Sequence, residues 1–549
     1  MIKHLLIPVL LLTAIVSKAQ DTIVPKDLPI AGRIFGLQFT QAEVDSMYGA
    51  VKELRRDVDK MHALPLPNNV PMSLWQSPLL PGMQQTERQQ AVQWSIPANV
   101  SLPPQNNGLA FYNLLQLASL VKNKKITSVQ LTRYFISRLK KYSDTLQCTI
   151  SITEELAMAQ AKQADAEIAK GQYRGLLHGI PYGLKDLFAV KGTKTTWGAA
   201  PYKNQLIDED SYVYTKLKEA GAVLVAKFTL GALAMGDKWF GGRTNNPWNL
   251  KHGSSGSSAG SAAATVAGLV PFAIGTETWG SIISPSTSCG ATGLRPTFGS
   301  ISRSGGMVLS WSLDKVGPIC RSAEDAAIVF YYLHGTDGKD ESAVSRAFNY
   351  QQRIDTRKLK IAYAKNYFDK LKKDDPEWAV LESYRSMGIN PVPVNFPEEG
   401  AYNFDMMGII ISAESAAAFD ELTRSNKDDL LTWQTKNDWP NQFRTARFVS
   451  AVDYINANRH RYLLMQKVND TLSGFDAVIC PTWGGNQCAI TNLTGHPAVS
   501  LPIGFGKENL PQSITLVGNL YAEARLLAIA KLYQDNTGWQ NSHPAMFLK

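Results

Sequence analysis

Two short apolar runs with a helical segment between them place the strongest constraint on the fold of this 549-residue chain. The runs Gly179–Leu184 and Ala222–Ala226 are bounded by glycine and proline, as buried strands often are. Between them, Tyr212–Gly221 has the apolar spacing of a helix. Helical spacing also marks two separate segments, Leu114–Val121 and Leu131–Leu139, and a third, Glu154–Lys170. Strands that alternate with helices favour an α/β fold in which helices cover a sheet.

The N-terminus has the pattern of a secretory signal peptide over residues 1–19. A basic start at Lys3 precedes the apolar run Leu5–Val16, and Ser17-Lys18-Ala19 supplies a small-x-small cleavage pattern. The run is too short for a membrane span, which needs about 20 residues, and no later stretch of sequence is long and apolar enough. We expect a soluble protein, exported to a periplasm or the medium after cleavage near Ala19. Lys18 keeps a second interpretation open, in which the segment remains as an uncleaved N-terminal anchor.

The rest of the chain divides into an extension and one large domain. Residues 20–108 are proline-rich and irregular apart from a helical stretch near Thr40–Leu64. We interpret them as an N-terminal extension that wraps the main body. Regular patterning begins near residue 109, so the main domain is expected to span residues 109–540, and no internal repeat is visible.

Composition argues against several classes of function. The formal net charge of +9 is spread along the chain in short runs, which is typical of a solvated surface and not of a nucleic-acid interface. The five cysteines lack CxxC spacing and the eight histidines form no metal-binding motif, so we predict neither a metal nor a cofactor. For Cys480 and Cys488, a disulfide and two separate buried thiols fit the sequence equally well. The oligomeric state cannot be predicted from these features.

A segment rich in glycine and serine lies where core elements are expected. Gly253–Ser261 reads GSSGSSAGS, a composition common in flexible linkers. It runs directly into a small-residue helix predicted at Ala262–Gly268 and a buried strand predicted at Leu269–Gly275. A second turn, Gly275–Ile283 (GTETWGSII), follows at once. Because a linker does not lie between core elements, we interpret the segment as a functional loop.

Three separated motifs resemble those of the amidase signature family. That family has a Gly/Ser-rich loop, a helix and a strand, and then G-T-[DE]-x-x-G-S-[IV], with two serines 24 positions apart, as Ser257 and Ser281 are. It also has a lysine in a G-[IV]-P-x-x-[LV]-K-D strand, which Gly179–Asp186 (GIPYGLKD) matches, with Lys185 72 positions before Ser257. Matching segments extend the resemblance over about Ala110–Gln534. They are Cys289–Thr297, Leu313–Pro318 and Asn492–Gly504.

The resemblance implies a fold and a mechanism for amide hydrolysis. The fold is a single large α/β domain whose mixed, twisted central sheet is covered by helices on both faces. Ser281 is the expected nucleophile, Ser257 relays its proton, and Lys185 is the base. Lys185 must then be uncharged, although an exposed lysine has a pKa of about 10.4, and burial would lower that value. Ser257 is expected to follow a cis peptide bond, beside Gly256.

The resemblance also implies an oxyanion hole made of backbone N–H groups, which stabilise the charge that develops on the attacked carbonyl. Its members are expected to be Thr278, Trp279, Gly280 and Ser281. Supporting roles fall to Gly256, which lets the backbone approach closely, to Ser258, and to Glu277, which would brace the turn through hydrogen bonds.

Some positions depart from the family pattern. Trp279 stands where many members have glycine, and either a wall of the substrate pocket or a packing role fits it. Ile283 stands where many members, including transamidation enzymes, have arginine, which weakens the case for a carboxylate-bearing substrate such as glutamine.

The region from about Tyr402 to His460 is aromatic and methionine-rich, which is more typical of a core than of a pocket. If part of it lines the cleft, a hydrophobic or aryl amide is favoured. Its large side chains are Phe404, Met406, Met407, Ile410, Trp433, Trp439, Phe443 and Phe448.

The sequence therefore predicts an exported amidase that forms an acyl-enzyme on Ser281 and releases ammonia or an amine from a small-molecule or peptide amide. Three alternatives remain. The same serine could cleave an ester or carbamate. The chain could be the glutaminase subunit of a tRNA-dependent amidotransferase, which the signal peptide and Ile283 argue against. It could also be a binding protein on a catalytically inactive scaffold, which the intact serines and Lys185 argue against.

Overall fold

The computed structural model describes residues 23–34, 36–62, 68, 77–83, 87–104, 106–398 and 404–548. The predicted signal peptide lies outside these residues. The chain divides into two compact units, residues 1–67 and 68–549. In the part of the chain that the structure describes, no helix is both long and apolar enough to cross a membrane.

The described residues of the first unit form two helices, α1 (Asp27–Ile34) and α2 (Gln41–His62). Helix α2 matches the helix expected near Thr40–Leu64. Helix α1 was not expected, because the sequence DLPIAGRI contains a proline and a glycine, both poor helix formers. Pro29 lies in the first turn, where its missing N–H group costs no helical hydrogen bond.

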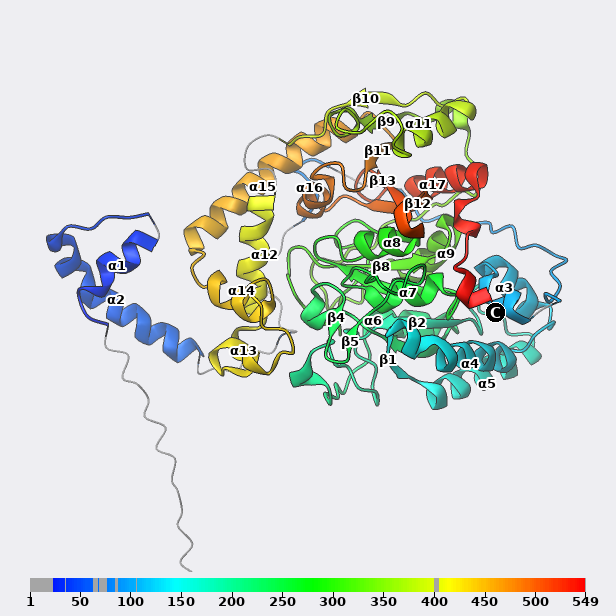
Figure 1. The fold of residues 1–549 in the computed structure, drawn as a ribbon, viewed down its shortest axis with the longest axis horizontal. Coiled ribbons are helices and arrows are strands. Elements are labelled where there is room, and N and C mark those ends of the chain that lie inside the picture. Colours follow the sequence, from blue (N-terminus) through cyan, green and yellow to red (C-terminus); the bar gives the residue numbers. More distant parts are fainter. Residues whose placement is uncertain are drawn as a thin grey trace, which may run out of the picture. The chain divides into compact units, whose positions relative to one another are not determined.

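The second unit is a single α/β domain built on a mixed sheet of 11 strands (Figure 1). The strand order is β1-β3-β2-β6-β8-β7-β12-β13-β11-β9-β10, and β4 pairs separately with β5. The strands are β1 (Thr149–Ile152), β2 (Pro181–Lys185), β3 (Val223–Phe228), β4 (Lys238–Trp239), β5 (Gly242–Arg243), β6 (Ala273–Glu277), β7 (Thr292–Arg295), β8 (Lys315–Cys320), β9 (Ile361–Ala364), β10 (Val392–Val394), β11 (Ala477–Pro481), β12 (Ala498–Phe505) and β13 (Pro511–Val517).

The described residues of this unit also form 15 α-helices. They are α3 (Leu114–Lys122), α4 (Ser128–Leu146), α5 (Glu154–Ala169), α6 (Tyr212–Glu219), α7 (Ala259–Val266), α8 (Ile283–Cys289), α9 (Ala323–Leu333), α10 (Lys365–Phe368), α11 (Glu377–Ser386), α12 (Phe404–Ala418), α13 (Asp420–Arg424), α14 (Trp439–Ala446), α15 (Ala451–Leu472), α16 (Gln487–Thr494) and α17 (Glu523–Thr537).

The predicted strand–helix–strand unit is confirmed as β2, α6 and β3. Strands β2 and β3 are parallel, with Lys185 opposite Phe228. Every residue of both strands is buried, as expected for parallel strands covered on both faces. Along β3, Val223 and Val225 pack in one hydrophobic cluster and Leu224 in another. The strand therefore carries apolar side chains on both of its faces, and helices α5 and α7 contact it.

The glycine- and serine-rich segment leads into core elements, as predicted, but their boundaries differ. Helix α7 begins at Ala259 and ends at Val266, earlier than expected. The strand predicted at Leu269–Gly275 is β6, which begins only at Ala273. Pro271 lies in the part that is not a strand, and proline has no N–H group to donate to a neighbouring strand. Strand β6 pairs in parallel with β2 and so lies next to the strand that ends at Lys185.

Helices α12 and α15 lie side by side and build part of the region that was expected to be core (Figure 1). Met407 and Ile410 of α12 pack with Leu464 of α15 in one buried cluster. Phe443 of α14 is fully buried as well, whereas Phe448 is 57% exposed. The side chain of Phe404 lies outside the described residues.

Candidate active site

Lys185, at the end of β2, is a fully buried lysine surrounded by hydroxyl groups. Its Nζ lies 2.7 Å from Ser257 Oγ, 2.8 Å from Thr276 Oγ1 and 3.2 Å from Ser258 Oγ. Burial lowers the pKa of Lys185 to about 7, although the negative charges of Asp314 and Glu277 act in the opposite direction. A lysine with such a pKa is partly neutral near pH 7 and can accept a proton there.

Ser257 is held in the loop before α7, in contact with Lys185. The peptide bond between Gly256 and Ser257 is cis, as the family resemblance led us to expect. The next residue anchors the loop to β6, because Ser258 Oγ donates to Thr276 O and accepts from Thr276 N, both at 3.1 Å. Lys185 and Ser257 are therefore brought together by two neighbouring strands and the loop that packs on them.

Ser281 lies in the turn between β6 and α8 and is 7% exposed. Its carbonyl oxygen accepts a hydrogen bond from Ser258 N at 3.1 Å, which joins the two glycine- and serine-rich segments. Within the described residues, the hydroxyl groups of Ser257 and Ser281 do not hydrogen-bond to each other. The structure thus places Ser281 beside the Lys185–Ser257 pair through a backbone contact.

The carboxylate of Glu277 accepts four hydrogen bonds at this turn and around it. One oxygen accepts from the N–H groups of Ile282 and Ile283, at 2.8 and 2.9 Å. The other accepts from Arg295 at 3.0 Å and from Asn492 at 2.7 Å. Burial alone would raise the pKa of Glu277, but the charge of Arg295 and these donors outweigh it, so its pKa lies below the ordinary value. Glu277 is therefore an ionised anchor for the start of α8.

Thr278, Trp279, Gly280 and Ser281, predicted to form the oxyanion hole, follow β6 directly. Among the described residues, no acceptor takes a hydrogen bond from the N–H group of Gly280 or Ser281. Trp279 is half-buried and packs against the cluster that contains Ile283. The hydroxyl of Thr278 donates to Asp314 at 2.5 Å.

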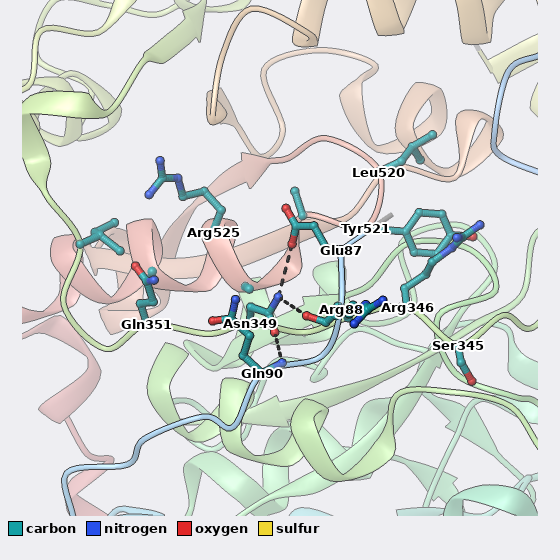
Figure 2. A pocket seen from close by; sticks show the side chains of 15 residues that line it. Glu87, Arg88, Gln90, Ser345, Arg346, Asn349, Gln351, Leu520, Tyr521 and Arg525 are labelled. Carbon is teal, nitrogen blue, oxygen red and sulfur yellow. Dashed lines mark hydrogen bonds between the residues drawn. The ribbon is translucent and has the colours of Figure 1, made fainter. Parts of the chain in front are cut away.

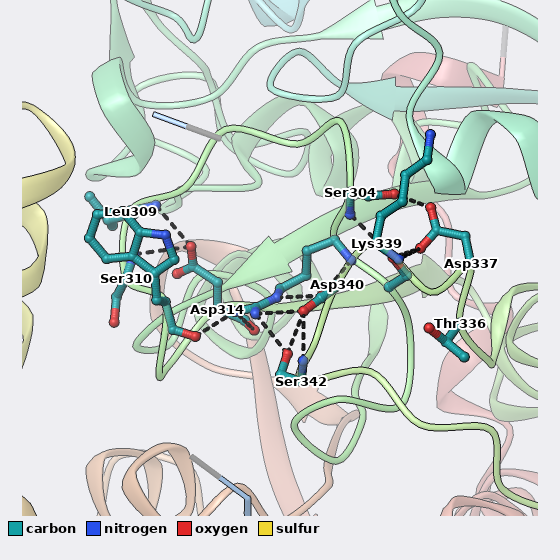
Figure 3. A network of polar contacts seen from close by, with 12 residues as sticks. Ser304, Leu309, Ser310, Asp314, Thr336, Asp337, Lys339, Asp340 and Ser342 are labelled. Atoms are coloured by element: carbon teal, nitrogen blue, oxygen red, sulfur yellow. Dashed lines mark hydrogen bonds and ion pairs between the residues drawn. The ribbon is translucent and has the colours of Figure 1, made fainter. Parts of the chain in front are cut away.

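Asp314 is a second buried carboxylate beside the turn. Besides Thr278, it accepts the N–H groups of Leu309 and Ser310, at 2.8 and 3.0 Å. Burial raises the pKa of Asp314, against the hydrogen bond from Thr278 and the charge of Arg303. Figure 3 shows Asp314 within a network of polar contacts. In this network Arg303 forms an ion pair with Asp340, with Nε and Oδ2 2.8 Å apart.

A pocket of about 210 Å³ lies near this cluster, between the segment 232–238 and α14. A larger pocket, of about 910 Å³, lies elsewhere in the second unit and is lined by Arg88, Arg346 and Arg525 among others (Figure 2). None of the predicted site residues lines either pocket. The smaller pocket adjoins the loop of Ser257 through Gly236, whose carbonyl oxygen lies 1.9 Å from the position of a Cβ atom added at Gly256.

The cysteines are separate thiols. Cys480 and Cys488 are not bonded to each other. Burial raises the pKa of Cys488 to about 12, so this thiol stays protonated at neutral pH. Within the described ranges, no group of three histidine, cysteine or acidic side chains is arranged to hold a metal ion.

The family model described as Amidase matches residues 130–527 of the chain. The chain belongs to the amidase signature family. The match spans β2, the loop of Ser257 and the turn of Ser281, so the whole cluster lies within the region that defines membership. A family member of this kind is a hydrolase or an amidotransferase that acts on C–N bonds.

Curated relatives and solved structures agree with membership in the amidase signature family. A glutamyl-tRNA(Gln) amidotransferase subunit of Coxiella burnetii is 33% identical, over 79% of this chain and 99% of the relative. The corresponding protein of Acinetobacter baumannii is 32% identical, over 79% of this chain and 98% of that relative. The crystal structure of peptide amidase from Stenotrophomonas maltophilia has a TM-score of 0.71 and 26% identity, over 79% of this chain and 98% of that chain.

Sequence reasoning missed some residues of the candidate site. Thr276, which contacts Lys185, is the fixed threonine of the motif G-T-[DE]-x-x-G-S-[IV], and that motif was the available signal. Asp314 lies in a segment that resembles the family, and that segment was the available signal. Arg295 and Asn492 also lie in such segments, but their contacts with Glu277 depend on the packing of distant strands and helices.

Proposed function

We propose that this chain is an exported amidase that hydrolyses a carboxylic amide through an acyl-enzyme on Ser281. The observation that carries the proposal is the contact between the buried Lys185 Nζ and Ser257 Oγ at 2.7 Å, with a lysine pKa of about 7. A serine hydroxyl is a weak nucleophile, and a neutral base within reach is what activates it.

In this mechanism, Ser281 Oγ attacks the carbonyl carbon of the amide. Its proton passes to Ser257 Oγ while the proton of Ser257 passes to Lys185 Nζ. The C–N bond then breaks, and the same path returns a proton to the departing nitrogen. Water hydrolyses the acyl-enzyme by the reverse relay and releases a carboxylic acid. The relay requires the hydroxyl groups of Ser257 and Ser281 to approach each other, and catalytic hydrogen bonds often tighten only when substrate binds.

The turn after β6 would stabilise the oxyanion. The N–H groups of Gly280 and Ser281, which no acceptor among the described residues takes up, would donate to the oxygen of the attacked carbonyl. Glu277 holds the following N–H groups of Ile282 and Ile283 in place, so the turn needs little rearrangement as charge develops.

A second candidate function is that of the amidotransferase component, since the curated relatives at 33% identity bear that name. The isoleucine at position 283 argues against this second function. Many transamidation enzymes of the family carry arginine at this position, where it can pair with a carboxylate. Here the side chain is 1% exposed and packs in an apolar cluster. We therefore favour hydrolysis of an amide that lacks a carboxylate over glutamine hydrolysis.

Export is the remaining part of the proposal. It rests on the basic start, apolar run and cleavage pattern of residues 1–19. Mass measurement of the N-terminus after expression in a bacterium with an intact secretion pathway tests it. A mature protein that begins near Gln20 supports export, and a retained Met1 opposes cleavage.

The decisive experiment compares the mature protein with Ser281→Ala on a panel of short aliphatic amides, anilides, peptide amides, long-chain acyl amides and free glutamine. We expect the wild type to cleave at least one of the first four groups and Ser281→Ala to cleave none. A serine-directed phosphonate should label Ser281 in the wild type. An unlabelled, inactive wild type would support the alternative of a binding protein, and activity on glutamine alone would support the amidotransferase component.

A further inference from the structure

The pocket of about 210 Å³ has an aromatic and apolar wall. Trp433 and Trp439 supply two indole rings from the region of α14, and Met235 faces them from the segment 232–238. The other residues that line it are Ala232, Gly236, Asp237, Lys238, Leu431, Asp438 and Pro440.

The segment 232–238 also contacts the catalytic cluster. Ala234 lines a small cavity of about 20 Å³ together with Thr276 and Thr278, which flank Glu277. A Cβ atom added at Gly256 would lie only 1.9 Å from the carbonyl oxygen of Gly236. The segment that forms one wall of the pocket therefore touches both the loop of Ser257 and the turn after β6.

Trp439 fixes the opposite wall. Its indole N–H donates to Ala232 O at 3.0 Å and to Leu233 O at 3.1 Å. Its ring stacks on that of Phe443, with centroids 4.8 Å apart and planes at 11°. These contacts bind α14 to the segment 232–238, so the pocket keeps its width without a ligand.

Trp433 provides the ring that a ligand can reach. It is half-buried, whereas Trp439 is only 6% exposed. The ammonium of Lys238 lies 4.6 Å from the centroid of the Trp433 ring, a distance at which a cation and an aromatic face attract each other. The contact holds the indole in position at the pocket.

We propose that this pocket receives an aromatic group of the amide, so that the enzyme prefers aryl or arylalkyl amides to short aliphatic ones. The inference rests on the proposed function of Ser281. A benzene molecule fits an apolar cavity of roughly 150 Å³. The pocket of about 210 Å³ therefore has room for one phenyl ring with a short linker, beside the charged side chains of Asp237, Lys238 and Asp438 that also line it. Stacking on Trp433 favours a ring over an alkyl chain of similar area.

Two matched substrate pairs test the inference, each differing by a phenyl group. Propionamide and 3-phenylpropionamide place the ring on the acyl side, and N-methylacetamide and N-benzylacetamide place it on the amine side. The enzymes are the wild type, Trp433→Ala and Trp378→Ala. Trp378 is a half-buried tryptophan on α11 that packs on Phe368 and lines neither the site nor this pocket.

In at least one pair, the wild type should show a higher kcat/KM for the phenyl-bearing amide. Trp433→Ala should lower that kcat/KM by about tenfold and change that of the small amide by less than about twofold, because only the ring loses its contact. Trp378→Ala should change neither value by more than about twofold.

Equal losses on both members of each pair in Trp433→Ala, or no loss on either, would overturn the inference while leaving the amidase assignment intact. So would a wild type that is labelled on Ser281 by a phosphonate and prefers the small amides or cleaves none of the four. If Ser281 resists the phosphonate and no amide is cleaved, the proposed function itself fails and the inference fails with it.

Discussion

Arg295 and Glu277 form an ion pair at 3.0 Å in which neither side chain has any exposed surface. Glu277 also accepts the N–H groups of Ile282 and Ile283, which directly follow Ser281. The pair therefore connects β7 to the turn that carries the predicted nucleophile. A buried charge that loses its partner is costly, so this connection should matter to folding.

Replacement of Arg295 by methionine should lower the free energy of unfolding by about 3–5 kcal/mol, because it leaves the carboxylate of Glu277 buried and unpaired. Arg357→Met is the matched control. Arg357 pairs with Asp355 at 2.9 Å, but its side chain is 88% exposed, and exposed pairs contribute about 0–1 kcal/mol. Urea denaturation of both variants measures the difference. Similar losses in the two would show that the buried pair is not a specific anchor.

The activity of the wild type should rise as the pH increases through about 7, the pKa to which burial lowers Lys185. Below that pH Lys185 is protonated and cannot accept the proton of Ser257, and above it the lysine is neutral. A profile of kcat/KM against pH, with folding checked by circular dichroism, provides the measurement. Activity that falls steadily above neutrality in a folded protein would contradict a lysine base.

Asp314→Asn should shift this profile toward lower pH. The negative charge of Asp314 stabilises the protonated form of Lys185 and so raises its pKa. Removing the charge therefore makes the lysine neutral at a lower pH. Asp337→Asn is the control, since Asp337 belongs to the network of Figure 3 through Ser302 and Ser304. A profile that shifts equally in both variants, or only in the control, would refute a direct effect of Asp314.

Adjacent serines offer a sharp test of the relay. Ser257→Ala should lower kcat by about 100- to 10,000-fold, the range for loss of a proton-transfer group. Ser258→Ala removes the hydrogen bonds between the loop and Thr276 and the 3.2 Å contact with Lys185 Nζ, but no proton of the relay. It should cost less than about tenfold. Single-turnover kinetics on the best amide of the panel would compare them. Equal effects would indicate that Ser257 only supports the loop.

Gly256→Ala should destabilise the protein by about 1–3 kcal/mol, as overpacking of a core does. The added methyl group would lie 1.9 Å from Gly236 O, and a backbone atom cannot turn away as a flexible side chain can. Gly474→Ala is the control, because nothing lies within 4 Å of a Cβ at that position. Thermal melting of both variants gives the comparison, and a stable, fully active Gly256→Ala would show that the loop has room to move.

The parts of the structure that follow from local sequence were predictable. Strand β2, helix α6 and strand β3 each carry their own apolar pattern and punctuation, so their order and type could be inferred. The contact of Lys185 with Thr276 could not be inferred from such patterns. It depends on the parallel pairing of β2 with β6, two strands far apart in the sequence.

Which aromatic side chains near α14 are buried could not be inferred from the local sequence either. Trp433 and Phe443 are both large aromatic residues in similar surroundings along the chain, yet Phe443 is fully buried and Trp433 lines a pocket. The difference arises from tertiary contacts, such as the bond from Trp439 to the carbonyls of Ala232 and Leu233. Composition alone could predict that most of the region is core, and could not identify which ring remains accessible.

The hydrogen bonds of Trp439 have a consequence for how this enzyme can diverge. Lys185 and Glu277 stand on paired strands of the central sheet, where a slip of one residue would turn each side chain to the opposite face. The pocket wall is instead built by α14 and the segment 232–238, which lie outside the sheet. Mutations in this wall can therefore broaden or narrow the range of accepted amides over evolutionary time, while the proton-transfer geometry is inherited unchanged.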